Sequence, residues 1–337
     1  MAAFRSSICL WCLLPGVAMS PAWGASPEAV DDPLVIEVET VDAWRFARVF
    51  QQTDGAPTPA QLQAGYLSGA GLGVEVFTPD RIVDADNLAR AIAANKEKYR
   101  HAIDLCLPEV ERTNAQLRAV YLAYRGLFPE RTMPPVAVVF GAANSGGTAD
   151  PRSQVIGLEV ACQGIADAES FHRAMRHLFA HETIHALQAP MREGSEVQRD
   201  LLAWALREGA ANFFAAMVTG GDITGADNAW GMAREAELWR DFVADRHTVR
   251  THWPAGKEPE EAAVKAATRW MWNGGNPPPG WPAELGYWIG HRIIGAYYQR
   301  QADKRAAIAT ILALEDADAI LRESGYGETF PAATGAR

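Results

Sequence analysis

Hydrophobic and polar residues follow two different periods along this 337-residue chain. Pro33–Thr40 (PLVIEVET) alternates apolar and polar positions, as a strand does. Two further strands are predicted, over Val136–Phe140, which is a short β-branched run, and over Gln154–Val160. Elsewhere the spacing is helical, and it predicts helices over Val41–Phe50, over Asp86 to about Leu127 with a break near Leu107-Pro108, and over Glu169–Leu187, Gln198–Val218, 228–245, 259–272, 284–300 and 303–322. The pattern predicts an α+β protein, predominantly α-helical, with a small β-sheet upstream of the centre.

Proline and glycine mark where the central helices end. Pro190 stops the first of them, and Gly220-Gly221 stops the second. The segment Asn273–Pro282 (NGGNPPPGWP) is predicted to be a loop, because so many prolines and glycines exclude regular structure. Trp272 and Trp281 flank this loop, and we interpret them as candidates to line a substrate cleft.

The first 24 residues have the features of a signal peptide. A positive start at Arg5 precedes a short apolar stretch, and small residues before Ala25 favour cleavage after Gly24. A membrane anchor is the competing interpretation, but the stretch is shorter than the roughly 20 apolar residues that a span needs, and it contains Pro15. The sequence therefore predicts an exported protein, periplasmic or secreted, with no transmembrane span after cleavage.

The charge balance bears on the partners of the protein, and the cysteine content bears on whether it contains a disulfide. Lys and Arg number 31 against 41 Asp and Glu, and no basic run is present, which argues against nucleic acid as a partner. Cys106 and Cys162 remain after removal of the leader. In an oxidising compartment they can form a disulfide, and two separate buried thiols are the alternative.

The sequence HExxH, at His181-Glu182-Thr-Ile-His185, lies inside a predicted helix. On a helix, positions i and i+4 face the same side, so both imidazoles can bind one Zn²⁺. Glu182 stands next to the first ligand, where its carboxylate can act as general base without binding the metal. A chance HExxH in a helical protein without metal is the simplest alternative.

A catalytic zinc needs a third protein ligand and one open position. Gln188 and Met191 occupy the places where a metzincin would have Gly and His, so that arrangement is excluded. Glu208 lies on the next predicted helix, 23 residues after His185, and the Gly-Ala-Ala that follows it would let two helices approach closely. We interpret Glu208 as the third ligand, which gives a His₂Glu site.

Two other histidines precede the motif, and they are not expected to bind the metal. His177 shares the helix face with His181 and His185, but eight residues of helix span about 12 Å, too far for one ion to bind all three. We interpret His177 and His172 as structural residues or as residues that contact a side chain that binds the metal.

HExxH followed by Glu-Gly-x-Ala on the next helix resembles the gluzincin group of zinc peptidases. More narrowly, the chain is similar to bacterial exported proteins classed as predicted zinc-dependent proteases of uncharacterised function, which have a segment like Gly286–Tyr297 near the C-terminus. The resemblance implies a zincin-like fold, with a small sheet beside the active-site helix whose edge strand binds an extended peptide. Gluzincins often place an acid one turn after the third ligand, where this chain has Asn212. Its amide oxygen can still accept a hydrogen bond from an imidazole but adds no charge.

The predicted reaction is hydrolysis of an amide bond with one Zn²⁺ per chain. Glu182 takes a proton from the attacking water and passes it to the leaving amine. The developing oxyanion needs a further donor, and Tyr287 and His291, one turn apart on a predicted helix, are the candidates.

We therefore expect a zinc peptidase with a peptide or protein substrate. Its predicted parts are a signal peptide (1–24), an N-terminal α/β region (25–130), a zincin-like catalytic domain (131–330) and a C-terminal tail (331–337). A catalytically silent, zinc-bearing envelope binding protein is the alternative. Retention of Glu182 and the lack of an obvious fourth ligand favour the enzyme, because structural zinc normally has four protein ligands. Oligomeric state and cleavage specificity are left open.

Overall fold

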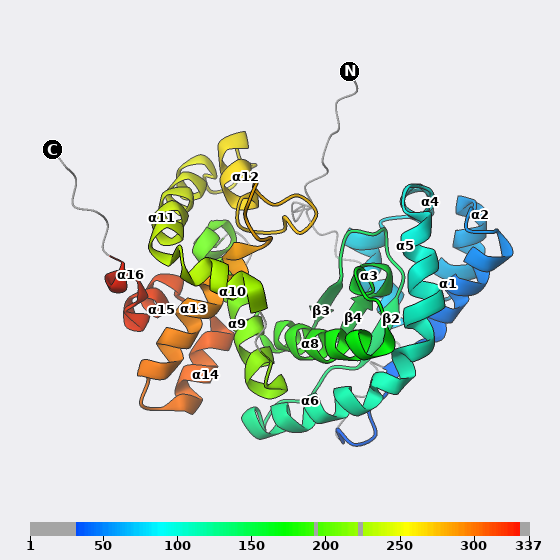
Figure 1. The fold of residues 1–337 in the computed structure, drawn as a ribbon, viewed down its shortest axis with the longest axis horizontal. Helices are drawn as coiled ribbons and strands as arrows, with labels where there is room; N and C mark the ends of the chain where they lie inside the picture. Colours follow the sequence, from blue (N-terminus) through cyan, green and yellow to red (C-terminus); the bar gives the residue numbers. More distant parts are fainter. Residues whose placement is uncertain (1–31, 192–194, 222–224, 331–337) are drawn as a thin grey trace. The chain divides into compact units, whose positions relative to one another are not determined.

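A computed structural model describes residues 32–191, 195–221 and 225–330 of the chain (Figure 1). The predicted signal peptide and the C-terminal tail lie outside these residues. The chain divides into two compact units. One consists of the described part of Met1–Ala115 with Thr132–His172, and the other of Gln116–Arg131 with the described part of Arg173–Arg337. The predicted boundary at residue 130 therefore does not coincide with the division between these units, since Thr132–His172 belongs with the first.

The first unit holds all the strands that the structure describes. Its elements in chain order, with short π- or 3-10-helical segments labelled η, are β1 (Val38–Glu39), α1 (Val41–Gln52), α2 (Pro59–Leu62), η1 (Gln63–Leu67), α3 (Leu72–Phe77), η2 (Thr78–Ile82), α4 (Ala85–Ala94), α5 (Lys96–His101), η3 (Ala102–Cys106), η4 (Leu107–Thr113), β2 (Val136–Val139), β3 (Gly147–Asp150), β4 (Ser153–Gly157) and α7 (Leu158–Ala161).

These strands form a mixed sheet in the order β1-β2-β4-β3. β1 and β4 run parallel to β2, and β3 pairs antiparallel with β4, with Thr148 opposite Val155. β2 and β4 are buried along their whole length, as central strands should be, and α1 and α3 pack on β2. The predicted α+β, predominantly helical class is thus confirmed. That an edge strand binds substrate stays a prediction.

Two of the predicted strands are shorter than expected. Pro33–Thr40 contributes only Val38 and Glu39, the residues that pair with β2. The prediction of a strand over Gln154–Val160 is wrong after Gly157, where α7 begins. The buried Glu159 side chain explains this turn, because its carboxylate oxygens accept hydrogen bonds from the backbone N–H groups of Gly141 (3.1 Å) and Ala143 (3.0 Å).

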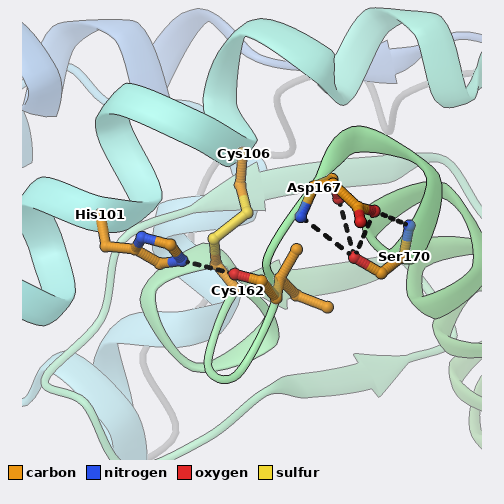
Figure 2. Close-up of a disulfide and its surroundings, with 6 residues drawn as sticks. His101, Cys106, Cys162, Asp167 and Ser170 are labelled. Carbon is orange, nitrogen blue, oxygen red and sulfur yellow. Dashed lines mark hydrogen bonds between the residues drawn. A yellow bond between two sulfur atoms is a disulfide. The ribbon is translucent and has the colours of Figure 1, made fainter.

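A disulfide joins Cys106 at the end of η3 to Cys162 after α7, with 6.2 Å between the two Cα atoms (Figure 2). Both cysteines are fully buried. Of the two open alternatives, the structure therefore shows the pair. Nearby, Asp167 and Ser170 exchange side-chain and backbone hydrogen bonds at the start of α8 (Ala168–Leu187), a reciprocal N-terminal cap that fixes where this helix begins (Figure 2).

The second unit consists of helices and their connecting loops, with no strand among the residues that the structure describes. Two of the three boundaries between the units fall inside helices, α6 (Asn114–Leu127) and α8. The elements that follow α8 are η5 (Glu196–Arg199), α9 (Leu201–Thr219), α10 (Gly225–Met232), α11 (Glu235–His252), α12 (Glu261–Thr268), α13 (Leu285–Arg300), α14 (Lys304–Ala313), α15 (Ala317–Ser324) and α16 (Tyr326–Thr329). Two of the predicted helices are each broken in two, because α10 gives way to α11 after Met232 and Leu314 takes a left-handed conformation (φ 43°) between α14 and α15.

Helices α9 and α13 form the closest helix pair of the second unit. A Cβ atom on Gly209 would collide with the backbone of Gly290 and His291, and one on Gly290 would collide with the backbone of Ala205. The small residue after Glu208 therefore allows α9 to approach α13. The Tyr124 hydroxyl of α6 donates a hydrogen bond to the carbonyl of Ala180 (2.8 Å), the residue of α8 that precedes the HExxH motif. No helix among the described residues is long and apolar enough to cross a membrane.

Candidate metal and active site

The HExxH motif lies in the last two turns of α8. Helical spacing places His181 and His185 on the same face, with 4.7 Å between ring centroids and 3.0 Å between their Nε2 atoms. His181 and Glu182 are 8% and 7% exposed, so the motif is mostly withdrawn from solvent. Two imidazoles this close, in a buried position, can share one metal ion.

Helix α9 brings Glu208 to the same point. Its Oε2 atom lies 3.0 Å from His185 Nε2 and 3.3 Å from His181 Nε2. Two ligands of a tetrahedral zinc with bonds of about 2.0–2.1 Å lie about 3.3–3.4 Å apart. The distance of 3.3 Å matches this spacing and the two distances of 3.0 Å are slightly shorter, so the three atoms can converge on one metal ion. Within the described residues no fourth His, Cys, Asp or Glu joins this group, which leaves a coordination position open.

The opposite nitrogens of both imidazoles are occupied, and this fixes which nitrogen carries the proton. His181 Nδ1 lies 2.8 Å from Asn212 Oδ1, and His185 Nδ1 lies 2.8 Å from Gln188 Oε1. The Gln188 amide cannot be reversed, because its Nε2 donates to the Arg207 carbonyl (2.8 Å). His185 Nδ1 must therefore be the donor, so its Nε2 lone pair faces the other two ligand atoms.

Three acceptor atoms that face one another repel unless a positive charge lies between them. Burial by itself lowers the pKa of His185, but the charge of Glu208 and a hydrogen bond to it outweigh burial and raise that pKa to about 9. The same contacts, acting against burial, hold the pKa of Glu208 well below its usual range. The site therefore stabilises a cation, either a proton shared within this group or a metal ion with both imidazoles neutral. The chemistry of these donors fits a divalent metal.

The general-base candidate Glu182 lies beside this group but is not part of it. It does not belong to the set of ligand atoms that approach within 4.8 Å of one another. Its charge nevertheless contributes to the raised pKa values of His185 and Tyr287, which places its carboxylate near both. A carboxylate close to the ligands without binding the metal is the arrangement that general-base catalysis needs.

Of the two oxyanion candidates on α13, Tyr287 faces the ligands. Its ring stacks on that of His181, with 6.4 Å between centroids and 13° between the planes. Burial, followed by the charges of Glu208 and Glu284, raises the pKa of Tyr287 well above its usual value. The hydroxyl is therefore a neutral donor at any physiological pH.

His291, one turn further along α13, has a different environment. Its ring lies 5.9 Å from the ring of Phe213, and it lines a cavity of about 300 Å³ together with residues of α13 and of the α15–α16 region, Tyr326 among them. The oxyanion role of His291 stays a prediction.

His177 and His172, the two histidines that precede the motif, agree with the structural interpretation. The ring centroid of His177 lies 5.9 Å from that of His181 with the planes tilted by 49°, and burial, with a smaller contribution from the charge of His181, lowers the pKa of His177 to about 4, so it is neutral. In the first unit, His172 Nε2 lies 3.1 Å from a carboxylate oxygen of Glu109. Neither belongs to the group that could hold a metal.

Two residues near the ligands were not identified from the sequence. Gln188 appeared there only as a departure from the metzincin pattern, although its position three residues after His185 places it on the same helix face. Glu284 precedes α13, and its charge acts on both Glu208 and Tyr287. Its only indication in the sequence was its position three residues before Tyr287.

Comparison with known proteins identifies no relative, since no protein-family model, no curated protein and no solved structure matches this chain.

Proposed function

We propose that this protein is an exported, zinc-dependent peptidase of the gluzincin type. One observation carries the proposal: the ligand atoms of His181, His185 and Glu208 lie 3.0–3.3 Å from one another, and no fourth His, Cys, Asp or Glu of the described residues joins them. A structural zinc would be closed by four protein ligands. The open position therefore favours catalysis over the alternative of a silent zinc-bearing binding protein.

The side chains around this position have the chemistry that amide hydrolysis requires. A zinc ion held by the three ligands would supply Lewis acidity toward the scissile carbonyl. Glu182 accepts the proton of the attacking water and delivers it to the leaving amine. Tyr287 is a neutral donor whose hydroxyl can donate to the oxyanion that develops on the substrate.

Export is the second part of the proposal. It rests on the pattern of residues 1–24 and is supported by the buried disulfide between Cys106 and Cys162. Such bonds persist in oxidising compartments and are rare in the cytosol.

The test begins with the metal content of the purified mature protein, compared with His185→Ala and Glu208→Ala variants. We expect about one zinc per chain, lost in both variants. Hydrolysis of a mixed peptide library should then follow zinc loading and disappear in Glu182→Gln, which keeps the ligands. A native protein that takes up no zinc even when incubated with it would refute the proposal. Zinc binding with equal, background hydrolysis by the native protein and Glu182→Gln would favour the binding protein instead.

A further inference from the structure

Glu284 lies at the start of α13, three residues before Tyr287. The Tyr287 backbone N–H donates to the Glu284 carbonyl (2.9 Å), so the two residues lie in the same turn of the chain. Tyr287 stacks on His181, and the charge of Glu284 acts on both Tyr287 and Glu208, so this turn lies close to the candidate metal ligands. Glu284 is half-buried there.

The backbone holds Glu284 in a conformation that its residue type disfavours. Its φ is 58° and its ψ 38°, in the left-handed region where glycine and asparagine are usual. The Asn273 side chain fixes it, since its Oδ1 accepts the Glu284 N–H (2.7 Å) while its Nδ2 donates to the carbonyl of Arg269 (2.9 Å). Residues forced into such conformations cluster at functional sites, where the surrounding structure imposes them.

The carboxylate of Glu284 makes no hydrogen bond or ion pair with any residue that the structure describes, and it does not belong to the metal-ligand group. Burial, and then the charge of Glu208, raises its pKa against a smaller opposing effect of the charge of His181, so its surroundings disfavour the anion. Arg207, the residue before Glu208, directs its guanidinium to the Ala189 carbonyl (2.9 Å). A half-buried anion without an ion-pair partner among the described residues is suited to a cation from outside.

We propose that Glu284 binds a positively charged ammonium group of the substrate beside the metal site and so selects for cationic substrates. The inference rests on the proposed peptidase function and adds a substrate class to it. A metal ion would be balanced by Glu208 and Glu182, which leaves the negative charge of Glu284 for the substrate. In a peptide, the ammonium can be the free N-terminus or a lysine side chain, and the two are separated by the ligands chosen below.

The test measures binding rather than turnover, by calorimetry on the zinc-loaded mature protein. Three metal-chelating probes are compared: leucine hydroxamate, which has a free α-ammonium; Nα-acetyl-lysine hydroxamate, which has a side-chain ammonium; and Nα-acetyl-norleucine hydroxamate, which has neither. We expect one of the two cationic probes to bind the native protein about tenfold more tightly than the neutral one, the order for one ion pair at a half-buried site. Which one it is identifies the source of the ammonium.

Two neutral variants separate charge from backbone effects. Glu284→Gln keeps the shape of the side chain, and Glu284→Asn relieves the left-handed strain. The preference should fall to about one in both and should persist in Glu261→Gln, which removes an exposed charge of α12. Equal or absent binding of charged and neutral probes by the native protein, or a preference that survives in the neutral variants, would overturn the inference. Charge-selective binding without peptide hydrolysis would refute the proposed function alone, and hydrolysis without charge preference would refute this inference alone.

Discussion

Asn212 offers the most direct test of how the protein prepares its metal ligands. Its Oδ1 accepts a hydrogen bond from His181 Nδ1 at 2.8 Å, and the residue is 7% exposed. Replacement by leucine keeps the approximate volume and removes the acceptor. The Nδ1–H group would then be buried without this partner, and the ring would lose both its orientation and part of its basicity.

The expected losses of zinc affinity and of stability in Asn212→Leu follow from this single contact. Groups that orient a metal-binding histidine are typically worth about 10–100-fold in metal affinity, or about 1.4–2.8 kcal/mol. The metal-free protein should lose about 1–3 kcal/mol of unfolding free energy, since one buried donor is left unsatisfied. Asn212→Asp should bind zinc at least as tightly as the native protein, because a carboxylate accepts the same hydrogen bond and adds a negative charge.

Zinc affinity is measured by competition with a chromophoric chelator, and stability by urea unfolding of the metal-free proteins. Circular dichroism of each variant confirms that it is folded before affinity is compared. If Asn212→Leu binds zinc as tightly as the native protein, then the contact with His181 does not prepare the ligand. If Asn212→Asp binds zinc more weakly than Asn212→Leu, then the added carboxylate acts by repulsion, and the assignment of the hydrogen bond is wrong.

Three further predictions concern the scaffold and are checked by urea unfolding. Gly209→Ala should destabilise the protein by about 3 kcal/mol, because the added Cβ would collide with the backbone of α13. Gly126→Ala in α6 is the control and should be neutral or stabilising, since nothing lies within 4 Å of the added Cβ. Equal effects of the two substitutions would contradict the close packing of α9 and α13. Removal of the disulfide by replacing Cys106 and Cys162 with alanine should cost about 4 kcal/mol for a separation of 56 residues, and an unchanged midpoint would show that the bond does not form. Burial raises the pKa of Glu159 from 4.5 to about 7, so the folded state retains a proton that the unfolded state releases. The unfolding free energy should therefore fall by about 3 kcal/mol as the pH rises from about 4.5 to above 7. Glu159→Gln should lose this pH dependence, and a variant that keeps it would show that another group is the cause.

The sequence predicted helices α8 and α9 closely because both are long and end at strong stop signals, Pro190 and Gly220. Strand β3 was not predicted, because Gly147–Asp150 (GTAD) has little strand propensity and is a strand only through its pairing with β4. Tertiary contacts decided this element, and local pattern alone does not contain them.

The same distinction applies to the candidate site. His181, Glu182 and His185 follow from one motif on one helix, and Glu208 follows from its spacing and the small residues after it. Glu284 could not be derived in this way, because its position depends on the Asn273 contact across an eleven-residue separation. A loop of prolines and glycines gives no periodicity from which that contact could be inferred.

Helix α13 connects the metal ligands to the residues expected to contact substrate. Gly290 lies against α9 at Ala205 and Gly209, directly beside the ligand Glu208, so the two helices cannot slide past each other without a backbone collision. One turn earlier on α13, Tyr287 stacks on His181. A displacement of α13 would therefore move Tyr287, the proposed oxyanion donor, and disturb a candidate metal ligand at the same time. From this coupling, overpacking at Gly209 should weaken zinc binding as well as stability, whereas a substitution that only lowers stability should leave the affinity of the folded protein for zinc unchanged.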